Sequence, residues 1–253
     1  MTTRLESNLR ALTARIEQAC KACEPCEKGG RAPKEIELVC VTKSVEPSTA
    51  LELSRLGRLD LGENRLQELV RKADFFQERG AQARWHFIGH LQRNKVRRAV
   101  GLAAVFHSID SLRLLDTLQR ACAEEQRTAL IYLEVELTGG VTRSGFRADE
   151  IPAALRRVGE LDRLRCAGLM TLGPAPSADA SASARASRAV FARLRELRDA
   201  LGGEGFEGPR AKLSMGMTSD LEAAIAEGSD VVRVGSALFE GVQPGGDPVG
   251  AEA

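Results

Sequence analysis

This sequence contains few aromatic residues and has almost no net charge. Each of these features argues against particular classes of binding partner. Aromatic residues make up 4% of the 253 residues, with one Trp and one Tyr, and the formal net charge is +1. Single-stranded nucleic acids are bound by stacking bases on aromatic rings, and anionic surfaces are bound by a field of positive charge. We therefore expect neither a nucleic acid nor a membrane as a partner.

The sequence also lacks a long apolar run and a framework of paired cysteines. No window approaches the roughly 18 consecutive apolar residues of a membrane-spanning helix. The first segment carries Glu6 and Glu17 where a secretory leader would be apolar. The six Cys are too few to staple a chain that is 43% hydrophobic and can build its own core. The expected location is the cytoplasm, with the cysteines reduced.

Apolar runs rich in β-branched residues alternate along the chain with segments of helical periodicity. After an amphipathic helix over 3–23, each expected strand is followed by helical or helix-compatible sequence. A stretch rich in Ala, Ser and Pro, 173–184, is expected to be a mobile loop. The expected strands cover 36–43, 59–64, 85–89, 104–110, 129–137, 165–172, 211–216 and 230–235. The expected helices between them cover 47–56, 65–80, 92–100, 111–126, 148–161, 185–201 and 218–228.

This alternation predicts an α/β fold with parallel strands and helices packed outside them. Eight repeats favour closure into a single (β/α)8 TIM-type barrel. We expect one domain over 1–253, with the helix 3–23, a barrel over about 36–241 and a short flexible tail at 242–253. An open doubly wound sheet is the alternative, although the first strand lacks the G-x-G-x-x-G loop of a dinucleotide site.

Lys43 closes the first expected strand, VCVTK. In a barrel of this kind, functional residues gather at the carboxyl ends of the strands. An amine at an apolar mouth loses solvation, which disfavours its charged form, and a neutral amine is the form that attacks an aldehyde or ketone. Position alone fits equally a lysine that emerges from the strand into solvent.

Small and hydroxyl-bearing residues follow the seventh and eighth expected strands. Ser214 opens the segment SMGMT, and Arg233 opens RVGS, which contains Gly235 and Ser236. Backbone N–H groups and hydroxyls at such positions bind anions, and these two loops are the usual phosphate site of the fold. Ordinary turn and cap residues would give the same composition.

A reactive lysine and a phosphate site at one mouth indicate a phosphorylated carbonyl compound. Pyridoxal 5'-phosphate fits this description, and so does the substrate of a Schiff-base aldolase acting on a sugar phosphate. Arg233 favours the cofactor, because it could pair with the ring nitrogen. An arginine stays protonated, so it would keep that nitrogen unprotonated and weaken the electron sink.

These motifs together resemble the pyridoxal phosphate homeostasis protein family, whose fold is that of the N-terminal barrel of alanine racemase. The resemblance implies that Lys43 carries the cofactor as an aldimine, that Arg233 faces the pyridine nitrogen and that Asn64 lies near the ring. It implies that Ser214, Gly235 and Ser236 hold the phosphate. The matching stretches are VTKSVEP (41–47), LGENRLQE (61–68), WHFIGHLQRNK (85–95), HSIDS (107–111), GLMTLGP (168–174), LSMGMTSDLEAAIAEGS (213–229) and VRVGSALFEG (232–241).

Two positions depart from the pattern of that family. Ser236 stands where the family usually has Thr, and a hydroxyl is kept. Arg143 precedes Ser144 and Gly145 where the family usually has Lys-Ser-Gly.

A racemase of the alanine type needs a second base opposite its lysine, and there it is a Tyr from a second domain. The only Tyr here, Tyr132, lies in the middle of the fifth expected strand, and we expect it to pack in the barrel wall. We therefore expect a monomer that buffers or delivers pyridoxal phosphate, with apo-enzymes as transient partners, no catalytic residue and no robust turnover. A weak amino-acid racemase and a sugar-phosphate aldolase remain as alternatives.

Three further features carry no functional prediction. Cys20, Cys23 and Cys26 have metal-like spacing, but no nearby His completes a tetrahedral site, and we expect no metal. The three histidines, at 86, 90 and 107, do not form a ligand pattern either. The basic cluster Arg93–Arg98 is either a solvated helix face or a docking patch for an acidic partner.

Overall fold

A computed structural model describes residues 3–23, 36–139, 144–175 and 177–242. Eight parallel strands form a closed barrel in the order of the sequence, and β1 pairs with both β2 and β8. The predicted barrel is confirmed, and the open sheet is excluded because the first and last strands are hydrogen-bonded to each other. The strands are β1 (Glu37–Val41), β2 (Asp60–Glu63), β3 (Arg84–Phe87), β4 (Val105–Ile109), β5 (Ala129–Glu134), β6 (Leu164–Met170), β7 (Lys212–Ser214) and β8 (Val231–Val234).

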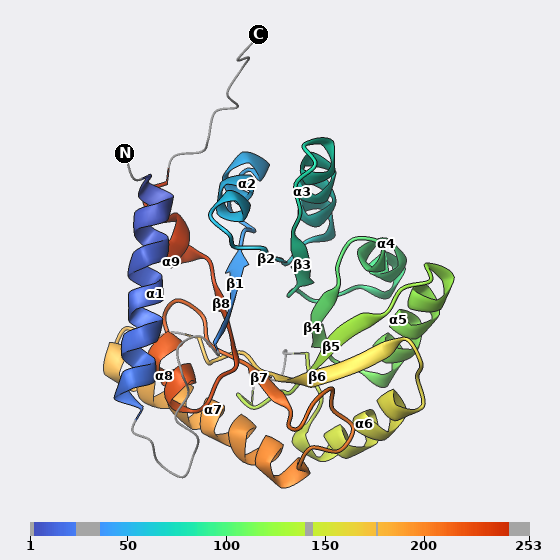
Figure 1. Cartoon of the computed structure of the whole chain (residues 1–253). Helices are drawn as coiled ribbons and strands as arrows, with labels where there is room; N and C mark the ends of the chain where they lie inside the picture. Colours follow the sequence, from blue (N-terminus) through green and yellow to red (C-terminus); the bar gives the residue numbers. More distant parts are fainter. Residues whose placement is uncertain (1–2, 24–35, 140–143, 176, 243–253) are drawn as a thin grey trace.

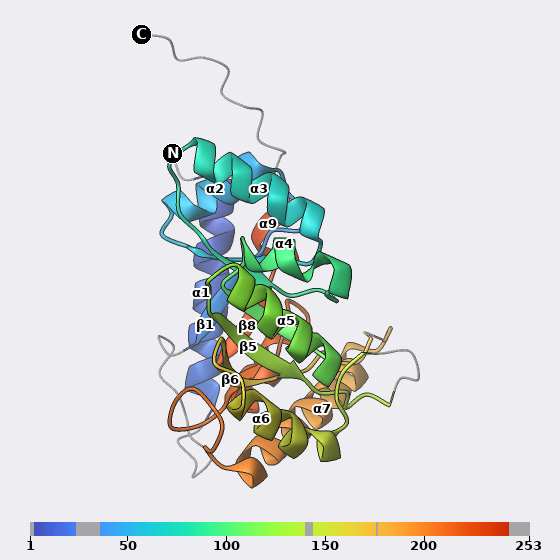
Figure 2. The ribbon, with the colours of Figure 1, turned by 90° about the vertical axis from the view of Figure 1, so that its right-hand side faces the viewer.

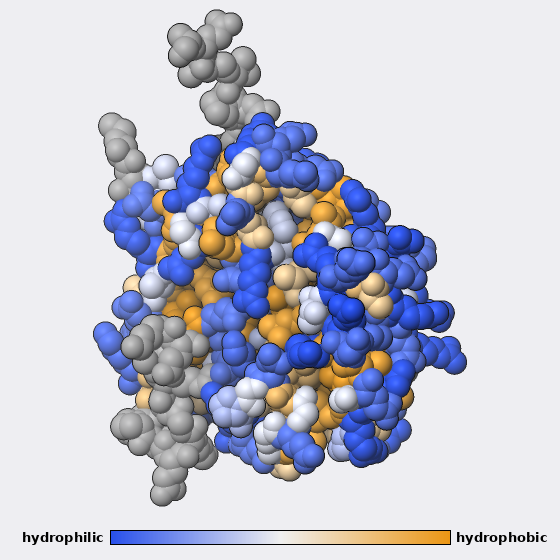
Figure 3. Space-filling view, turned by 45° about the vertical axis from the view of Figure 1, so that its right-hand side comes forward, coloured by the Kyte–Doolittle hydropathy of each residue, from blue (hydrophilic) through white to orange (hydrophobic). Residues whose placement is uncertain are grey.

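Helices surround the barrel, and α5 and α6 lie outside β5 and β6 in both ribbon views (Figures 1 and 2). No helix within the described ranges is long and apolar enough to cross a membrane. The surface in Figure 3 is largely hydrophilic, with apolar side chains visible in hollows between charged ones. The helices are α1 (Arg4–Ala22), α2 (Pro47–Arg55), α3 (Leu66–Glu78), α4 (Val96–Val100), α5 (Leu112–Glu124), α6 (Ile151–Gly159), α7 (Ala180–Leu201), α8 (Leu221–Ala226) and α9 (Ser236–Phe239), with 3-10 turns η2 (Arg93–Lys95) and η3 (Ala148–Glu150).

The N-terminal helix α1 packs on α8 and α9, the helices that follow β7 and β8 (Figure 1). Its apolar stripe is buried, as the periodicity predicts. Arg15 pairs with Glu222 of α8 at 2.8 Å, and Asn8 donates to the carbonyl of Leu238 at 2.9 Å. The helix therefore holds the segment that follows β8. The buried stripe consists of Leu5, Leu9, Leu12 and Ile16.

The prediction of a loop over 173–184 is wrong at its second half, because α7 already begins at Ala180. Asp179 caps this helix, since its side chain accepts from the backbone N–H groups of Ser181 and Ala182 at 2.8 and 3.1 Å. Alanine has the highest helix propensity, so an Ala-rich stretch behind a good N-cap forms helix rather than loop.

Side chains inside the barrel form a group separate from the main core between strands and helices. The apolar members of this inner group include Val39, Val105, Tyr132 and Val231. Polar contacts also cross the lumen, since His107 of β4 is bonded to Ser214 of the non-adjacent β7. The inside of the barrel is therefore packed with side chains of both kinds, as in other barrels of this class.

Candidate functional site

Lys43 lies in the turn between β1 and α2, two residues after the end of β1. The backbone N–H of Val45 donates to the carbonyl of Thr42 at 3.1 Å and closes this turn. The expected desolvation of Lys43 is wrong for this structure, because the side chain is exposed. An exposed amine at the carboxyl end of β1 is accessible to a carbonyl compound that enters the mouth.

A buried ion pair lies directly beneath this turn. Lys72 of α3 donates to Glu63 Oε1 at 2.7 Å and to the carbonyl of Thr42 at 2.9 Å. The Thr42 hydroxyl donates to the same carboxylate oxygen at 2.5 Å. Sequence reasoning missed this cluster. The signal was available, because Lys72 follows Leu69 by three residues and precedes Phe76 by four, on the buried stripe of α3.

Arg233 of β8 points into the barrel and is buried, with 4% of its surface exposed. Its two terminal nitrogens donate to Ser214 Oγ at 2.6 Å and to the Thr171 carbonyl at 3.1 Å. Burial lowers the pKa of Arg233 to about 10, while Asp220 and Glu134 oppose that shift. The guanidinium is therefore still a cation at neutral pH.

The two loops expected to hold a phosphate meet through a residue that sequence reasoning missed. Ser236 donates to the hydroxyl of Thr218 at 2.9 Å, and the backbone N–H of Ala237 donates to the same oxygen at 3.4 Å. Thr218 lies in the segment SMGMT, which held the signal. Ser214, the predicted member of that segment, is fully buried beside Arg233 and away from this cluster.

Gly235 lies against the strand that leads to Lys43. A Cβ at this position would lie 2.8 Å from the Val41 carbonyl oxygen, which is closer than side chains normally approach. The register agrees, since β8 pairs with β1 through Val234 and Cys40. Only a glycine lets the loop after β8 pack this closely beside the turn that carries Lys43.

Asn64 follows β2 and is half-buried. A Cβ at Gly89 would overlap the backbone of Asn64, so the loop after β3 packs tightly on it. Asn64 also lines a pocket of about 210 Å³ together with His90 and Lys95. His90 in turn pairs with Asp110 at 3.1 Å. The predicted ring contact is thus on the same end of the barrel as Lys43.

Glu134, at the end of β5, is a buried acid that the sequence analysis did not single out. Burial raises its pKa to about 7, helped by Asp110 and Glu136 and opposed by Arg233. A folded-state pKa above the unfolded value means that the unfolded state loses its proton first as the pH rises. The carboxyl therefore costs stability progressively from about pH 4.5 to about pH 7.

We expect Glu134→Gln to abolish this part of the pH dependence. Between about pH 4 and pH 8, the wild type should lose about 3 kcal/mol more unfolding free energy than the variant, which has no ionising group at that position. Urea unfolding of both proteins at the two pH values measures the difference. Equal losses in the two proteins would show that Glu134 ionises as readily in the barrel as in the unfolded chain.

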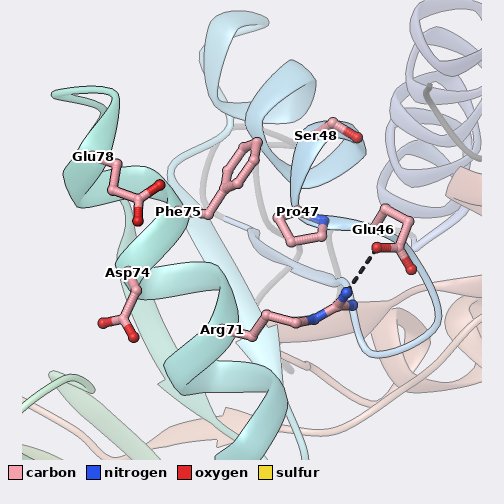
Figure 4. A pocket seen from close by; sticks show the side chains of 7 residues that line it. All are labelled: Glu46, Pro47, Ser48, Arg71, Asp74, Phe75 and Glu78. Atoms are coloured by element: carbon pink, nitrogen blue, oxygen red, sulfur yellow. Dashed lines mark hydrogen bonds and ion pairs between the residues drawn. The ribbon is translucent and has the colours of Figure 1, made fainter. Parts of the chain in front are cut away.

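Other features lie on or between the surrounding helices. A groove of about 430 Å³ runs between α2 and α3, where Arg71 reaches Glu46 at 2.7 Å (Figure 4). In the basic cluster Arg93–Arg98, Arg97 pairs with Glu125 at 2.9 Å. Cys20 is buried in α1, whereas Cys26, Arg143 and the tail from 243 fall outside the described residues. None of these features contains a predicted cofactor contact.

Three possible metal-ligating atoms gather at the opposite end of the barrel, from Glu37, Asp60 and His86. Arg84 lies 3.7 Å from Glu37 and 3.6 Å from Asp60, and Lys212 lies 3.4 Å from Glu37. Two cations already balance the two carboxylates, so the arrangement is explained by ion pairing.

Comparisons with known proteins agree with the barrel fold. The family described as "Alanine racemase, N-terminal domain" matches residues 4–243. A pyridoxal phosphate homeostasis protein of Pseudomonas aeruginosa is 36% identical over 240 residues, covering 93% of this chain and 94% of the relative. One of Aquifex aeolicus is 34% identical over 224 residues, covering 88% and 93%.

Solved structures share the fold of this chain. PipY of Synechococcus elongatus PCC7942, solved with PLP bound, is 29% identical with a TM-score of 0.71, covering 90% of this chain and 99% of PipY. A D-threonine aldolase from Filomicrobium marinum, 17% identical with a TM-score of 0.64, shares the fold over 61% of its length.

Proposed function

Because the chain belongs to the pyridoxal phosphate homeostasis protein family, we propose that it holds pyridoxal 5'-phosphate covalently on Lys43 and serves to buffer or deliver it within the cell. One observation carries this proposal. The exposed Lys43 follows β1, and the buried cation Arg233 lies on β8. The hydroxyl pair Ser236–Thr218 joins the segments that follow β8 and β7, and the three strands are neighbours in the barrel.

The residues fit the chemical groups of this cofactor. A phosphate accepts hydrogen bonds. The Thr218 hydroxyl accepts from Ser236 and from the backbone N–H of Ala237, and its own proton is available to a phosphate at the mouth beside Gly235. When bound, the cofactor would supply an aldehyde carbon, and the Lys43 amine would replace its oxygen, which leaves as water. Asn64 follows β2, the strand that neighbours β1, and the proposal places it near the ring.

Arg233 supports a carrier rather than an efficient enzyme. A fixed cation beside the ring nitrogen disfavours protonation of that nitrogen, so the ring stabilises a carbanion poorly. Tyr132 supports the same conclusion, because it is 1% exposed and stacks on His107 with ring centroids 4.6 Å apart. Burial also raises its pKa. It is therefore poorly placed to serve as a second base.

The proposal includes three finer points that follow from the sequence. The protein acts in the cytoplasm, it is a monomer, and apo-enzymes take the cofactor from it transiently. A transfer assay tests the last point: the loaded protein is mixed with an apo-enzyme that depends on pyridoxal phosphate, and the recovery of its activity is followed. Alanine racemisation at rates typical of enzymes would contradict the carrier function.

Lys43→Ala should abolish the covalent adduct. The wild type mixed with pyridoxal phosphate should gain a visible absorption band. After borohydride reduction, peptide mass spectrometry should find the added mass on the peptide that contains Lys43. Lys21→Ala, which removes an exposed lysine of α1, is the matched control and should retain the adduct. An adduct mapped to a different lysine would refute the assignment.

A further inference from the structure

A continuous chain of hydrogen bonds begins at Arg233 and crosses the inside of the barrel. Arg233 is 2.6 Å from Ser214 Oγ, and Ser214 Oγ is 2.8 Å from His107 Nδ1. His107 Nε2 is 2.9 Å from His86 Nδ1, and His86 Nε2 is 3.0 Å from Asp60 Oδ1. The chain runs over β8, β7, β4, β3 and β2, and so links the mouth to the opposite end.

The position of each proton follows from the two ends of this chain. Arg233 can only donate, so Ser214 Oγ accepts from it. Burial alone would raise the pKa of Asp60, but the hydrogen bond from His86 and the charge of Arg84 hold it below its usual range. An ionised Asp60 can only accept, so His86 carries its proton on Nε2.

If both histidine rings are neutral, the donor and acceptor in each of the remaining hydrogen bonds are then determined. His86 Nδ1 accepts from His107 Nε2, and His107 Nδ1 accepts the single proton of Ser214. The surroundings of His107 favour neutrality. It contacts His86 and stacks on Tyr132, and its complete burial lowers its pKa well below the usual range, an effect to which the nearby cations Arg233 and Arg84 add.

We propose that His107 and His86 are positioning residues for Arg233, both neutral with the proton on Nε2, and that they tie its guanidinium through Ser214 to the Asp60 carboxylate. Every hydrogen bond of the chain points from the arginine towards the aspartate. The part of this inference that concerns the cofactor rests on the proposed function, in which Arg233 faces the ring nitrogen.

One consequence concerns the phosphate. Ser214 has a single hydroxyl proton, and in this chain that proton is donated to His107. No proton remains for a phosphate oxygen, so Ser214 orients Arg233 instead. The phosphate contacts that the sequence predicts for Ser214 fall to Thr218, the hydroxyl that Ser236 contacts at the mouth.

The first test uses NMR to locate the protons on the histidine rings, and it needs no cofactor. Nitrogen-15 labelling of histidine gives signals from only three residues, and His90→Gln identifies those of the exposed ring. We expect His86 and His107 each to show an unprotonated Nδ1 and a protonated Nε2 at neutral pH. A doubly protonated ring, or a proton on Nδ1 of either one, overturns the inference.

The second test breaks the chain beside Arg233. Ser214→Ala should weaken pyridoxal phosphate binding about tenfold, the usual effect of losing one hydrogen bond to a charged group. The adduct on Lys43 should remain, and the His107 Nδ1 signal should shift. Ser229→Ala is the matched control, because Ser229 is an equally buried serine that donates to the Met215 carbonyl at 2.8 Å outside the chain.

The two proposals fail in distinguishable ways. If Ser214→Ala binds the cofactor as tightly as the wild type, the coupling to Arg233 is refuted and the carrier function stands. If the wild type does not bind pyridoxal phosphate, the carrier function is refuted. The histidine NMR signals then still decide whether the chain of hydrogen bonds from Arg233 to Asp60 exists. Ser214→Thr keeps the hydroxyl and should restore binding, which separates the hydrogen bonds from general damage to the fold.

Discussion

Lys72→Met should lower the free energy of unfolding by about 3–5 kcal/mol, the usual cost of breaking a buried ion pair by removing one partner. Lys72 and Glu63 both have side chains that are 0% exposed. Within the described part of the chain, Glu63 Oε2 has no hydrogen-bond partner, so Lys72 and Thr42 satisfy this carboxylate through Oε1 alone. Without the ammonium group, a charge would stay buried with a single hydroxyl donor.

Urea unfolding of the variant measures this loss. Lys212→Met is the matched control, because Lys212 pairs with Glu37 at 3.4 Å while 49% of its side chain is exposed, and exposed pairs contribute at most about 1 kcal/mol. The double variant Lys72→Met, Glu63→Gln should recover part of the stability, since it removes both charges. A loss below about 1 kcal/mol in Lys72→Met would contradict the importance of this buried ion pair for stability.

Gly168→Ala should destabilise the barrel by at least about 3 kcal/mol, at the upper end of the range for an overpacked core. Gly168 of β6 pairs with Lys212 of β7, and a Cβ there would overlap the Lys212 backbone. Backbone cannot move aside as a side chain can. The overlap is relieved only if β6 and β7 separate, and β7 has just three residues with which to hold its place.

Gly159→Ala supplies the comparison for this prediction. Gly159 is the last residue of α6, and a Cβ there would meet nothing within 4 Å. Because alanine favours helix over glycine, this change should be neutral or stabilise by up to about 1 kcal/mol. Thermal or urea unfolding of both variants checks the pair. Similar free energies of unfolding for the two variants would show that β6 and β7 can separate at little energetic cost.

The barrel was predictable from the sequence because periodicity and alternation are local properties. The run ending at Lys43 and the segments around Ser214 and Arg233 were assigned to the correct strand ends for that reason. The depth of each side chain in the barrel was not predictable. Ser214 and Thr218 belong to one short segment, yet one hydroxyl is buried under Arg233 and the other contacts Ser236 at the mouth. Ser214 is the last residue of β7 and Thr218 lies beyond it, so the difference depends on where the strand ends.

The polar network inside the barrel was missed for a related reason. His86 and His107 are far apart in sequence, and only the closed barrel brings their rings to 2.9 Å. Lys72 was overlooked because a lysine on a helix is ordinarily a surface residue. Its position on the apolar stripe of α3 was visible, but its partner Glu63 lies on a different element. Such pairs follow from tertiary contacts and not from local pattern.

The pairing of β1 with β8 has a consequence for the order in which the protein is made. Lys43 follows β1, whereas Arg233 and Gly235 lie on or just after β8, close to 200 positions later in the sequence. A ribosome therefore exposes the lysine long before the residues that complete its surroundings. Under the proposed function, a growing chain has the amine but lacks the proposed phosphate site, and it should retain the cofactor only once the last strand joins the first.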